Sequence, residues 1–193
     1  VAMPDTIGHT LLIPLIDRFA IRHPAVELRV MALHPNGVPL ALAAGDADVG
    51  VVSGAHRHSG VLSTPLATEE LHLVGPGPAA PVQAEAIPLR LPLQPDPVAV
   101  DEVALYPLVL PAIQPGLRAL IDAAFAQRQL RPNLVLEVDA EDAIIELVGS
   151  GRAFSIMSFA GVQRFVAAGQ LAARPIIDPP ISRTLLTARP ANR

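Results

Sequence analysis

The sequence predicts an α/β fold built from two similar α/β units with a proline-rich segment between them. Strand-like and helix-like patterns alternate along the 193 residues, of which 51% are hydrophobic, enough for one large domain or two small ones. Between Pro76 and Pro97 the composition shifts to Pro, Ala and Gln, which is typical of a loop or connection. Strands that alternate with helices indicate a mostly parallel sheet, whose ligands lie at the carboxyl ends of its strands.

The chain before the proline-rich segment begins with a βαβαβ series. Apolar residues recur at helical spacing over residues 10–22, and this helix is expected to stop before Pro24, because a residue that precedes proline avoids the helical region. A short helix at 38–44 ends at Gly45, a residue suited to a left-handed cap. Strands are predicted at residues 1–3, 26–31 and 47–52.

The alternation resumes after the proline-rich segment. The apolar run 108–110 lies between prolines and suits a strand buried on both faces. Pro115 and Gly116 then open a helix over residues 116–128. Further strands are predicted at 134–138, 154–157, 172–176 and 184–188, and further helices at 141–148 and 160–168.

The helix that starts at residue 116 follows a strand almost directly. Its first N–H groups lack intrahelical partners and carry the positive end of the helix dipole. Residues Gln114 to Leu117 are therefore candidates to receive a polar ligand. An ordinary strand-to-helix loop explains this stretch equally well, so the stretch alone leaves both interpretations open.

The composition excludes several classes of function. Cysteine is absent, which rules out disulfides, zinc–thiolate sites and thiol nucleophiles and fits a reducing compartment. No apolar run reaches the roughly 18 to 20 residues that a membrane span needs, and the first residues lack the features of a secretory signal. All positive side chains are scattered Arg residues, the net charge is −4 and aromatics make up 3%, so the chain itself is not expected to bind nucleic acid.

The histidines do not predict a metal site. His9, His34, His56 and His58 lie in the first third of the chain, but no Cys accompanies them and no HxxxH or HExxH spacing occurs. We expect His56 and His58 to be solvated loop residues. His9 lies near the start of the first helix, where a capping or lid role is expected rather than proton transfer.

Catalysis is not expected either. Ser53, Ser155 and Ser158 are the candidate nucleophiles, but the GxSxG elbow is absent. The phosphate-binding loops GxGxxG and GxxxxGK[ST] are absent too, so no nucleotide cofactor is predicted. The acidic group at 137–142 is interpreted as a strand end followed by a favourable acidic first turn of a helix, with paired catalytic carboxylates as the minor alternative.

The order of several motifs supports a more specific interpretation. The matching stretches are TLLIPLIDRFAIRHPAVELRV at 10–30, ALAAGDADVGVV at 41–52, PLATEELHLVGP at 65–76, YPLVLPAIQPGLRALIDAAF at 106–125, RPNLVLEVDAEDAIIELVGSGRAFSIM at 131–157 and AAGQLAARPIIDPPISRTLLTARP at 167–190. In this order they resemble the effector-binding domain of a LysR-type transcriptional regulator. The stretches PGLRALIDAAF and IDPPISRTL are most similar to the nitrogen-assimilation-control-like branch.

This resemblance implies an architecture and partners. It implies two Rossmann-like subdomains of the type 2 periplasmic-binding-protein fold, residues 1–75 with 181–193 and residues 76–180, joined by two crossover strands, with a small-molecule effector in the cleft. The family's winged helix-turn-helix would precede Val1 and is absent from this chain, so DNA would be bound only through that missing domain. The resemblance further implies a cytoplasmic homodimer or tetramer that associates through its effector domains, with residues 10–22 as a candidate face. It implies no enzyme activity, cofactor, metal or membrane contact.

The resemblance also implies effector-contacting positions, which fall at strand-to-helix connections. They are Asp5, Thr6, Ile7, Gly8, Pro35, Asn36, Ser53, Gln114, Pro115, Gly116 and Leu117. Asp5 and Ile7 depart from the Ser/Thr-rich pattern of the family, and a carboxylate at this lip would repel an anionic effector. Pro35 and Asn36 stand where Ser or Thr is commoner, so a helix cap is expected to be lost. Ser158 replaces a proline, which predicts a local change of turn only.

Two further readings stay open. A free-standing solute-binding protein of a transporter would share the fold, since fold does not fix function. A signal peptide in the full-length gene would favour that alternative, and an upstream helix-turn-helix would exclude it. A pure dimerisation module would show no ligand-dependent shift in stability.

Overall fold

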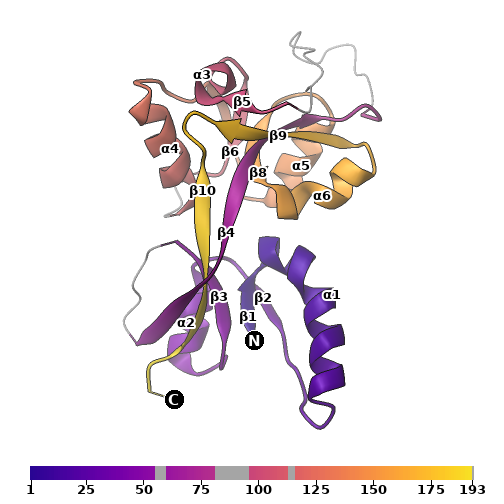
Figure 1. Ribbon diagram of the computed structural model, residues 1–193, viewed down its shortest axis with the longest axis vertical. Helices are drawn as coiled ribbons and strands as arrows, with labels where there is room; N and C mark the ends of the chain where they lie inside the picture. Colours follow the sequence, from indigo (N-terminus) through magenta and orange to yellow (C-terminus); the bar gives the residue numbers. More distant parts are fainter. Residues whose placement is uncertain (55–59, 81–95, 113–115, 193) are drawn as a thin grey trace. The chain divides into compact units, whose positions relative to one another are not determined.

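The computed structural model of the protein describes residues 1–54, 60–80, 96–112 and 116–192, with only the backbone of Asp5, Thr6 and His9 (Figure 1). The chain divides into two compact units. Unit 1 comprises Val1–Thr68 and Thr184–Arg193, and unit 2 comprises Glu69–Arg183. Each unit has a sheet and helices of its own.

Unit 1 is built on a short parallel sheet. Strand β1 (Ala2–Pro4) pairs in parallel with β2 (Met31–Leu33) on one side and β3 (Gly50–Ser53) on the other. Strand β10 (Ser182–Pro190) adds an antiparallel neighbour to β3. Helices α1 (Asp5–Arg22) and α2 (Gly37–Ala44) follow β1 and β2.

Apolar side chains on the two faces of this sheet form two clusters, because successive residues of a strand point to opposite faces. The first cluster packs Val38 and Leu42 of α2 against Ala2 and Val52. The second contains Met3, Ile7, Val51 and Leu185.

Two predictions about this part of the chain were wrong. The strand expected at residues 26–31 is observed only at Met31–Leu33. The preceding residues have no strand to pair with, because Met31 is the first to reach β1, where its N–H donates to the carbonyl of Val1 at 2.9 Å. The first helix begins at Asp5 instead of residue 10, since Pro4 ends β1 with an extended backbone and serves directly as the N-cap.

Unit 2 contains a larger mixed sheet, and two further strands beside it pair in parallel. Strand β6 (Leu108–Leu110) pairs in parallel with β7 (Leu134–Glu137), and the N–H of Val109 links β6 to β8 (Ser155–Ser158) by donating to Phe154 at 2.8 Å. Strand β4 (Val61–Pro76) runs antiparallel to β8 and to β9 (Leu171–Ile177), and β5 (Val98–Ala99) is parallel to β9. The helices are α3 (Val100–Val103), α4 (Leu117–Gln127), α5 (Glu141–Gly149) and α6 (Phe159–Ala167).

The sheet of unit 2 has one apolar cluster on each face, and Figure 1 shows the helices that flank this sheet. One cluster packs Tyr106, Ile121 and Phe125 against the sheet, and the other contains Val109, Val148 and Val162. Leu108 and Leu110 belong to the first cluster and Val109 to the second, so β6 is buried on both faces as predicted.

The sequence pattern did not reveal β4, which is the longest strand described. Its first half, from Leu62 to Thr68, is exposed and includes Pro65, so it lacks the apolar alternation of a half-buried strand. The bounds of β4 and β10 show that both strands run from one unit into the other. Among the described residues, none of the helices has the length and apolar character needed to cross a membrane.

Candidate functional site

The carboxyl ends of the parallel strands of unit 1 meet at one edge of its sheet. Strands β1, β2 and β3 end at Pro4, Leu33 and Ser53, and the register between them is parallel throughout. The predicted contact residues 5–8, 35–36 and 53 follow or close these strands. The structure therefore brings the predicted positions of unit 1 to the edge where ligands of parallel sheets bind.

The residues predicted as a loop at 5–8 form the first turns of α1 instead. Ile7 is only 5% exposed and packs in the core with Met3. Gly8 is buried too, and a Cβ added to it would lie 3.9 Å from the sulfur of Met3. Ile7 and Gly8 thus support the helix from the core side.

The start of α2 lacks a side-chain cap, as the sequence predicted for Pro35 and Asn36. The side chain of the N-cap Asn36 accepts no hydrogen bond from the first turn of α2, and its backbone is helical. His34, which the sequence analysis did not single out, takes up part of this role, because its Nδ1 accepts the N–H of Asn36 at 3.4 Å. His34 is exposed, and as the first residue after β2 it lies at the same edge as Ser53.

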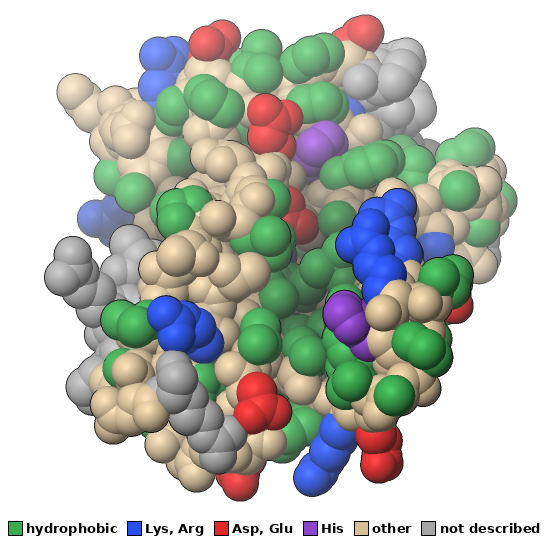
Figure 2. All heavy atoms as spheres, turned by 60° about the horizontal axis from the view of Figure 1, so that its bottom comes forward, with side chains coloured by type: hydrophobic (Ala, Val, Ile, Leu, Met, Phe, Trp, Pro, Cys, Tyr) green, Lys and Arg blue, Asp and Glu red, His purple; other side chains and the backbone are tan. Residues whose placement is uncertain are grey.

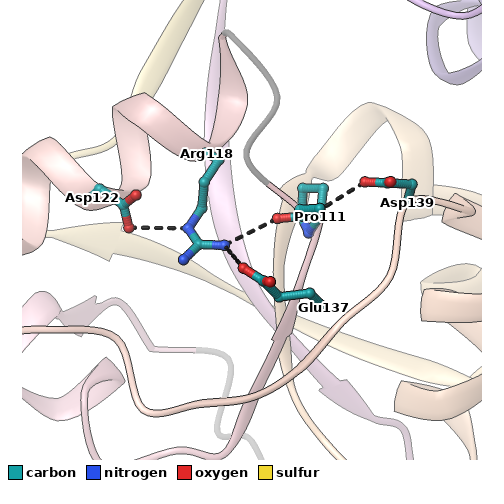
Figure 3. Close-up of polar contacts among 6 residues, drawn as sticks. Pro111, Arg118, Asp122, Glu137 and Asp139 are labelled. Carbon is teal, nitrogen blue, oxygen red and sulfur yellow. Dashed lines mark hydrogen bonds and ion pairs between the residues drawn. The ribbon is translucent and has the colours of Figure 1, made fainter.

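Unit 2 carries a polar cluster at the carboxyl ends of β6 and β7 (Figure 3). Arg118, in the first turn of α4, donates from Nε to the Asp122 carboxylate at 3.1 Å and from Nη1 to the Glu137 carboxylate at 2.7 Å. The same Nη1 donates to the carbonyl oxygen of Pro111 at 3.2 Å, just beyond the end of β6. The N–H of Ala112 donates to Asp139 Oδ1 at 3.0 Å.

Arg118 is almost fully committed to partners inside unit 2. Its side chain is 12% exposed, and the carboxylate of Glu137, followed by that of Asp122, raises the pKa of Arg118. The sequence analysis did not find this cluster, because Glu137 is 19 residues from Arg118 and on a different strand. An anion that approached this edge would meet a guanidinium already neutralised by two carboxylates.

The start of α4 is described from Gly116 onwards, so Gln114 and Pro115 lie outside the described residues. Gly116 is the N-cap, with φ 124° and ψ −97°, a backbone conformation that glycine adopts and side-chain-bearing residues avoid. Leu117 is partly buried and packs against the core of unit 2. Of the four predicted residues at this lip, the structure describes Gly116 and Leu117. Gly116 has no side chain that could lie between its backbone and a ligand.

The carboxyl end of β8 carries a further group that the sequence analysis missed. Ser158 caps α6 by accepting the N–H of Gly161 at 3.2 Å, which is more than the change of turn predicted for it. Phe159 is 41% exposed, and its ring lies 5.3 Å from that of His72 on β4. Burial lowers the pKa of His72, and within the described part of the chain its buried Nδ1 has no hydrogen-bond partner.

The remaining candidates for chemistry take structural roles or fall outside the described residues. Ser155 is fully buried and donates to the carbonyl oxygen of Val109 at 2.8 Å, so its hydroxyl links β8 to β6. Glu141 and Asp142 lie in the first turn of α5, as interpreted from the sequence. Within the described ranges, no three His, Asp or Glu residues come close enough to hold a metal ion. His56 and His58 lie outside those ranges.

Comparison with known proteins gives a consistent result. A family model described as "LysR substrate binding domain" matches residues 1–193. The HTH-type transcriptional regulator BbuR of Bordetella bronchiseptica is 27% identical over 193 residues, covering 98% of this chain and 54% of the relative. The nitrogen assimilation regulatory protein nac of Klebsiella aerogenes is 26% identical over 160 residues, covering 80% of this chain and 46% of the relative. The chain therefore spans about half the length of the curated relatives it matches.

Solved structures establish the fold. The effector-binding domain of QuiR in complex with shikimate has a TM-score of 0.80 at 21% identity, covering 100% of this chain and 86% of that one. The cofactor-binding domain of the Cbl transcriptional regulator has a TM-score of 0.78 at 18% identity, covering 100% of this chain and 79% of that one. The predicted α/β fold of the type 2 periplasmic-binding-protein class is confirmed by these neighbours.

Proposed function

Because this chain belongs to the family of LysR substrate-binding domains, we propose that it is the ligand-sensing part of a LysR-type transcriptional regulator. The observation that carries the proposal is the family match along the whole chain. In the full-length protein, an N-terminal helix-turn-helix would bind DNA, and this domain would bias that binding according to its ligand. Such coupling requires the ligand to bind one arrangement of the protein better than another. We further propose a cytoplasmic location and no catalytic activity.

We propose that the two subdomains of the family correspond to residues 1–75 with 181–193 and to residues 76–180, close to the limits of units 1 and 2. The proposed closeness to the nitrogen-assimilation-control branch is supported by the 26% identity to the nac protein. The alternative of a transporter's solute-binding protein is less well supported, since the curated relatives named above are transcriptional regulators.

We propose that the effector contacts the carboxyl edge of each sheet. In unit 1 the contacts would come from Asp5, Thr6, the Pro35-Asn36 turn and Ser53, and His34 joins them on the evidence of its position after β2. In unit 2 they would come from residues 114–117 at the start of α4. The support is positional, because each of these residues follows or closes a strand of a parallel pair.

We propose that the effector is a neutral, zwitterionic or hydroxyl-rich molecule rather than a simple anion. Asp5 places a carboxyl group in the first turn of α1. In unit 2, Arg118 is already paired with Asp122 and Glu137, and Asp139 adds a third carboxylate to the cluster. The N–H groups of the helix starts would then receive hydroxyl or carbonyl oxygens, which need no net charge.

We propose that the domain associates with a second copy through α1. Leu11, Ile13, Ile16 and Ile21 are 36%, 71%, 44% and 81% exposed, so α1 leaves apolar side chains on more than one side of the helix uncovered within unit 1. Figure 2 shows apolar side chains at the surface among Arg and acidic residues over this helix. Exposed apolar patches of this kind mark interaction surfaces. Ile13→Glu would convert a dimer to a monomer in light scattering, whereas an unchanged mass would exclude this face.

A thermal-shift screen tests the sensing function. The panel includes amino acids, sulfur and nitrogen metabolites, aromatic acids and shikimate, because a ligand specific to the folded state raises the melting temperature by mass action. A dose-dependent rise that is lost in Ser53→Ala but kept in Ser63→Ala, an exposed serine of β4, would support the proposed edge. A folded protein that responds to no compound would argue against ligand sensing. A response to simple anions alone would contradict the proposed effector class.

A further inference from the structure

Strands β4 and β10 are tied together by an ion pair at the point where both leave unit 2. The guanidinium of Arg183 donates from Nε to Glu69 Oε2 at 2.5 Å. The limits of the two units fall at the same place, between Thr68 and Glu69 on β4 and between Arg183 and Thr184 on β10. The pair therefore lies on the two segments by which the chain passes from one unit to the other.

This ion pair is the best shielded of those in the described part of the chain. The side chains of Arg183 and Glu69 are 11% and 13% exposed. In the other pairs at least one partner is 44% exposed or more. Exposed pairs contribute little because water and salt screen them, whereas a shielded pair is costly to separate.

Backbone bonds fix the strands next to the pair. The N–H of Leu71 donates to the carbonyl of Ile181 at 2.8 Å, and both side chains belong to the core of unit 2. Within unit 1, the hydroxyl groups of Thr64 and Thr187 lie 2.7 Å apart on the same two strands. The ion pair thus closes the end of the core at which β4 and β10 continue outward.

Packing alone gives no reason for two charges at this position. An apolar pair of similar volume would fill the space without the cost of removing two ions from water. Charged partners do specify one alignment of the strands, since any other alignment leaves a carboxylate or a guanidinium shielded and unpaired. Separating β4 from β10 at this point also leaves the two charges unpaired. A state in which one unit is unfolded and the other folded, with the strands apart at Glu69 and Arg183, therefore has a high free energy.

We infer that Glu69 and Arg183 form a register clamp that makes the two units unfold as one cooperative structure. The clamp fixes the alignment of β4 and β10 and prevents the crossing strands from separating while one unit stays folded. The same coupling is available to transmit a ligand-induced change along both strands. The inference stands on these contacts and needs no ligand to test.

Two probes that report on separate units provide the test. Tyr106 is the only tyrosine, tryptophan is absent, and Tyr106 is 2% exposed in the core of unit 2, so intrinsic fluorescence reports on unit 2. The chain contains no cysteine, and Val52 is 7% exposed in the core of unit 1. A Val52→Cys background therefore gives a single thiol whose labelling in urea reports on the unfolding of unit 1.

With the clamp intact, we expect the two probes to give the same urea midpoint. In Glu69→Ala and in Arg183→Ala, we expect the midpoints to separate and the lower one to fall by about 1 M, because each change leaves a shielded charge unpaired. Glu69→Gln, which keeps the shape of the side chain, is the milder variant if Glu69→Ala does not fold. The double change Glu69→Leu with Arg183→Met is expected to recover most of the lost stability but not the coincidence of the two midpoints.

Glu102→Ala is the matched control. It removes a carboxylate from Arg174, which is as well shielded as Arg183 but lies on β9, whereas Glu102 lies in α3, so this pair is on neither of the strands that run from one unit to the other. This variant is expected to lower both midpoints together. Separate midpoints with the clamp intact, coincident midpoints in both single clamp variants, or separation in the control as well would each overturn the inference.

Discussion

The substitution Gly77→Ala tests how closely β4 packs against the start of β9. Gly77 follows the last residue of β4, and its N–H donates to the carbonyl of Gln170 at 2.9 Å. A Cβ at this position would lie 2.3 Å from the oxygen of Gly169, 2.7 Å from the nitrogen of Leu171 and 2.8 Å from the carbonyl carbon of Gln170. All of these are backbone atoms, so no side chain can rotate away and the two segments must separate.

The expected cost follows from these distances. Overpacking in a close contact costs about 1–3 kcal/mol, and the displaced hydrogen bond from Gly77 to Gln170 adds about 1 kcal/mol. We therefore expect the free energy of unfolding to fall by about 3 kcal/mol. With a denaturant slope of about 2 kcal/mol per molar urea, the urea midpoint would fall by about 1.5 M.

Gly149→Ala serves as the control in the same core. Its added Cβ would meet only the Cδ2 atom of Leu171, at an ordinary contact distance of 3.7 Å. Gly149 ends α5, where alanine is favoured over glycine by about 0.5–1 kcal/mol, so this variant is expected to match or exceed the parent in stability. Urea unfolding followed by circular dichroism measures both variants. A loss below about 1 kcal/mol in Gly77→Ala would refute the close approach of the two segments.

Three further predictions concern the site. Ser158→Ala removes the cap on the Gly161 N–H and should lower the free energy of unfolding by about 1 kcal/mol in urea unfolding, and Ser158→Thr should restore most of it. Gly116→Ala places a side chain at φ 124° and should cost about 1–3 kcal/mol, with hydrogen exchange accelerated first at the start of α4; unchanged exchange there would contradict the strained cap. Because burial lowers the pKa of His72 from 6.5, the unfolded chain takes up a proton at a higher pH than the folded chain. Stability should therefore fall as the pH drops below about 7, and His72→Gln should show a smaller fall between pH 7.5 and 5.5.

The sequence predicted the elements of unit 2 well where periodicity was strong. Helix α5 and strand β6 lie within a residue of their predicted limits, because the apolar residues of α5 recur at helical spacing and those of β6 form a short run between prolines. Strand β4 was not predicted, since its first half is exposed and is held by pairing rather than by an apolar face. Pairing partners far apart in sequence leave no periodic signal. The same reason explains the wrong limits of β2, whose start depends on where β1 begins.

The candidate site likewise contains residues that the sequence predicted and residues that it did not. Ser53 was predicted to lie at a strand end, where the resemblance implies a contact, and the structure places it at the end of β3. Arg118 was not found, because its role depends on Glu137 and Pro111, which only the folded sheet brings to it. His72 was missed for a related reason, since the ring beside it belongs to Phe159 on another element. The place of a residue at a strand end can thus be predicted from the sequence, whereas the residue that pairs with a charged side chain cannot.

In the register clamp, the sequence does not show which glutamate pairs with Arg183. The sequence offers two adjacent carboxylates, Glu69 and Glu70, and 114 residues separate Glu69 from Arg183. Successive residues of a strand point to opposite faces, so a slip of one residue between β4 and β10 would bring Glu70 to the face of Arg183 and turn Glu69 to solvent. The structure places Glu69 with Arg183 and leaves Glu70 exposed. The ion pair favours one of these two alignments, because only that alignment shields a charge together with its partner. Coupling between the two units then rests on register, a property that neither strand specifies by itself.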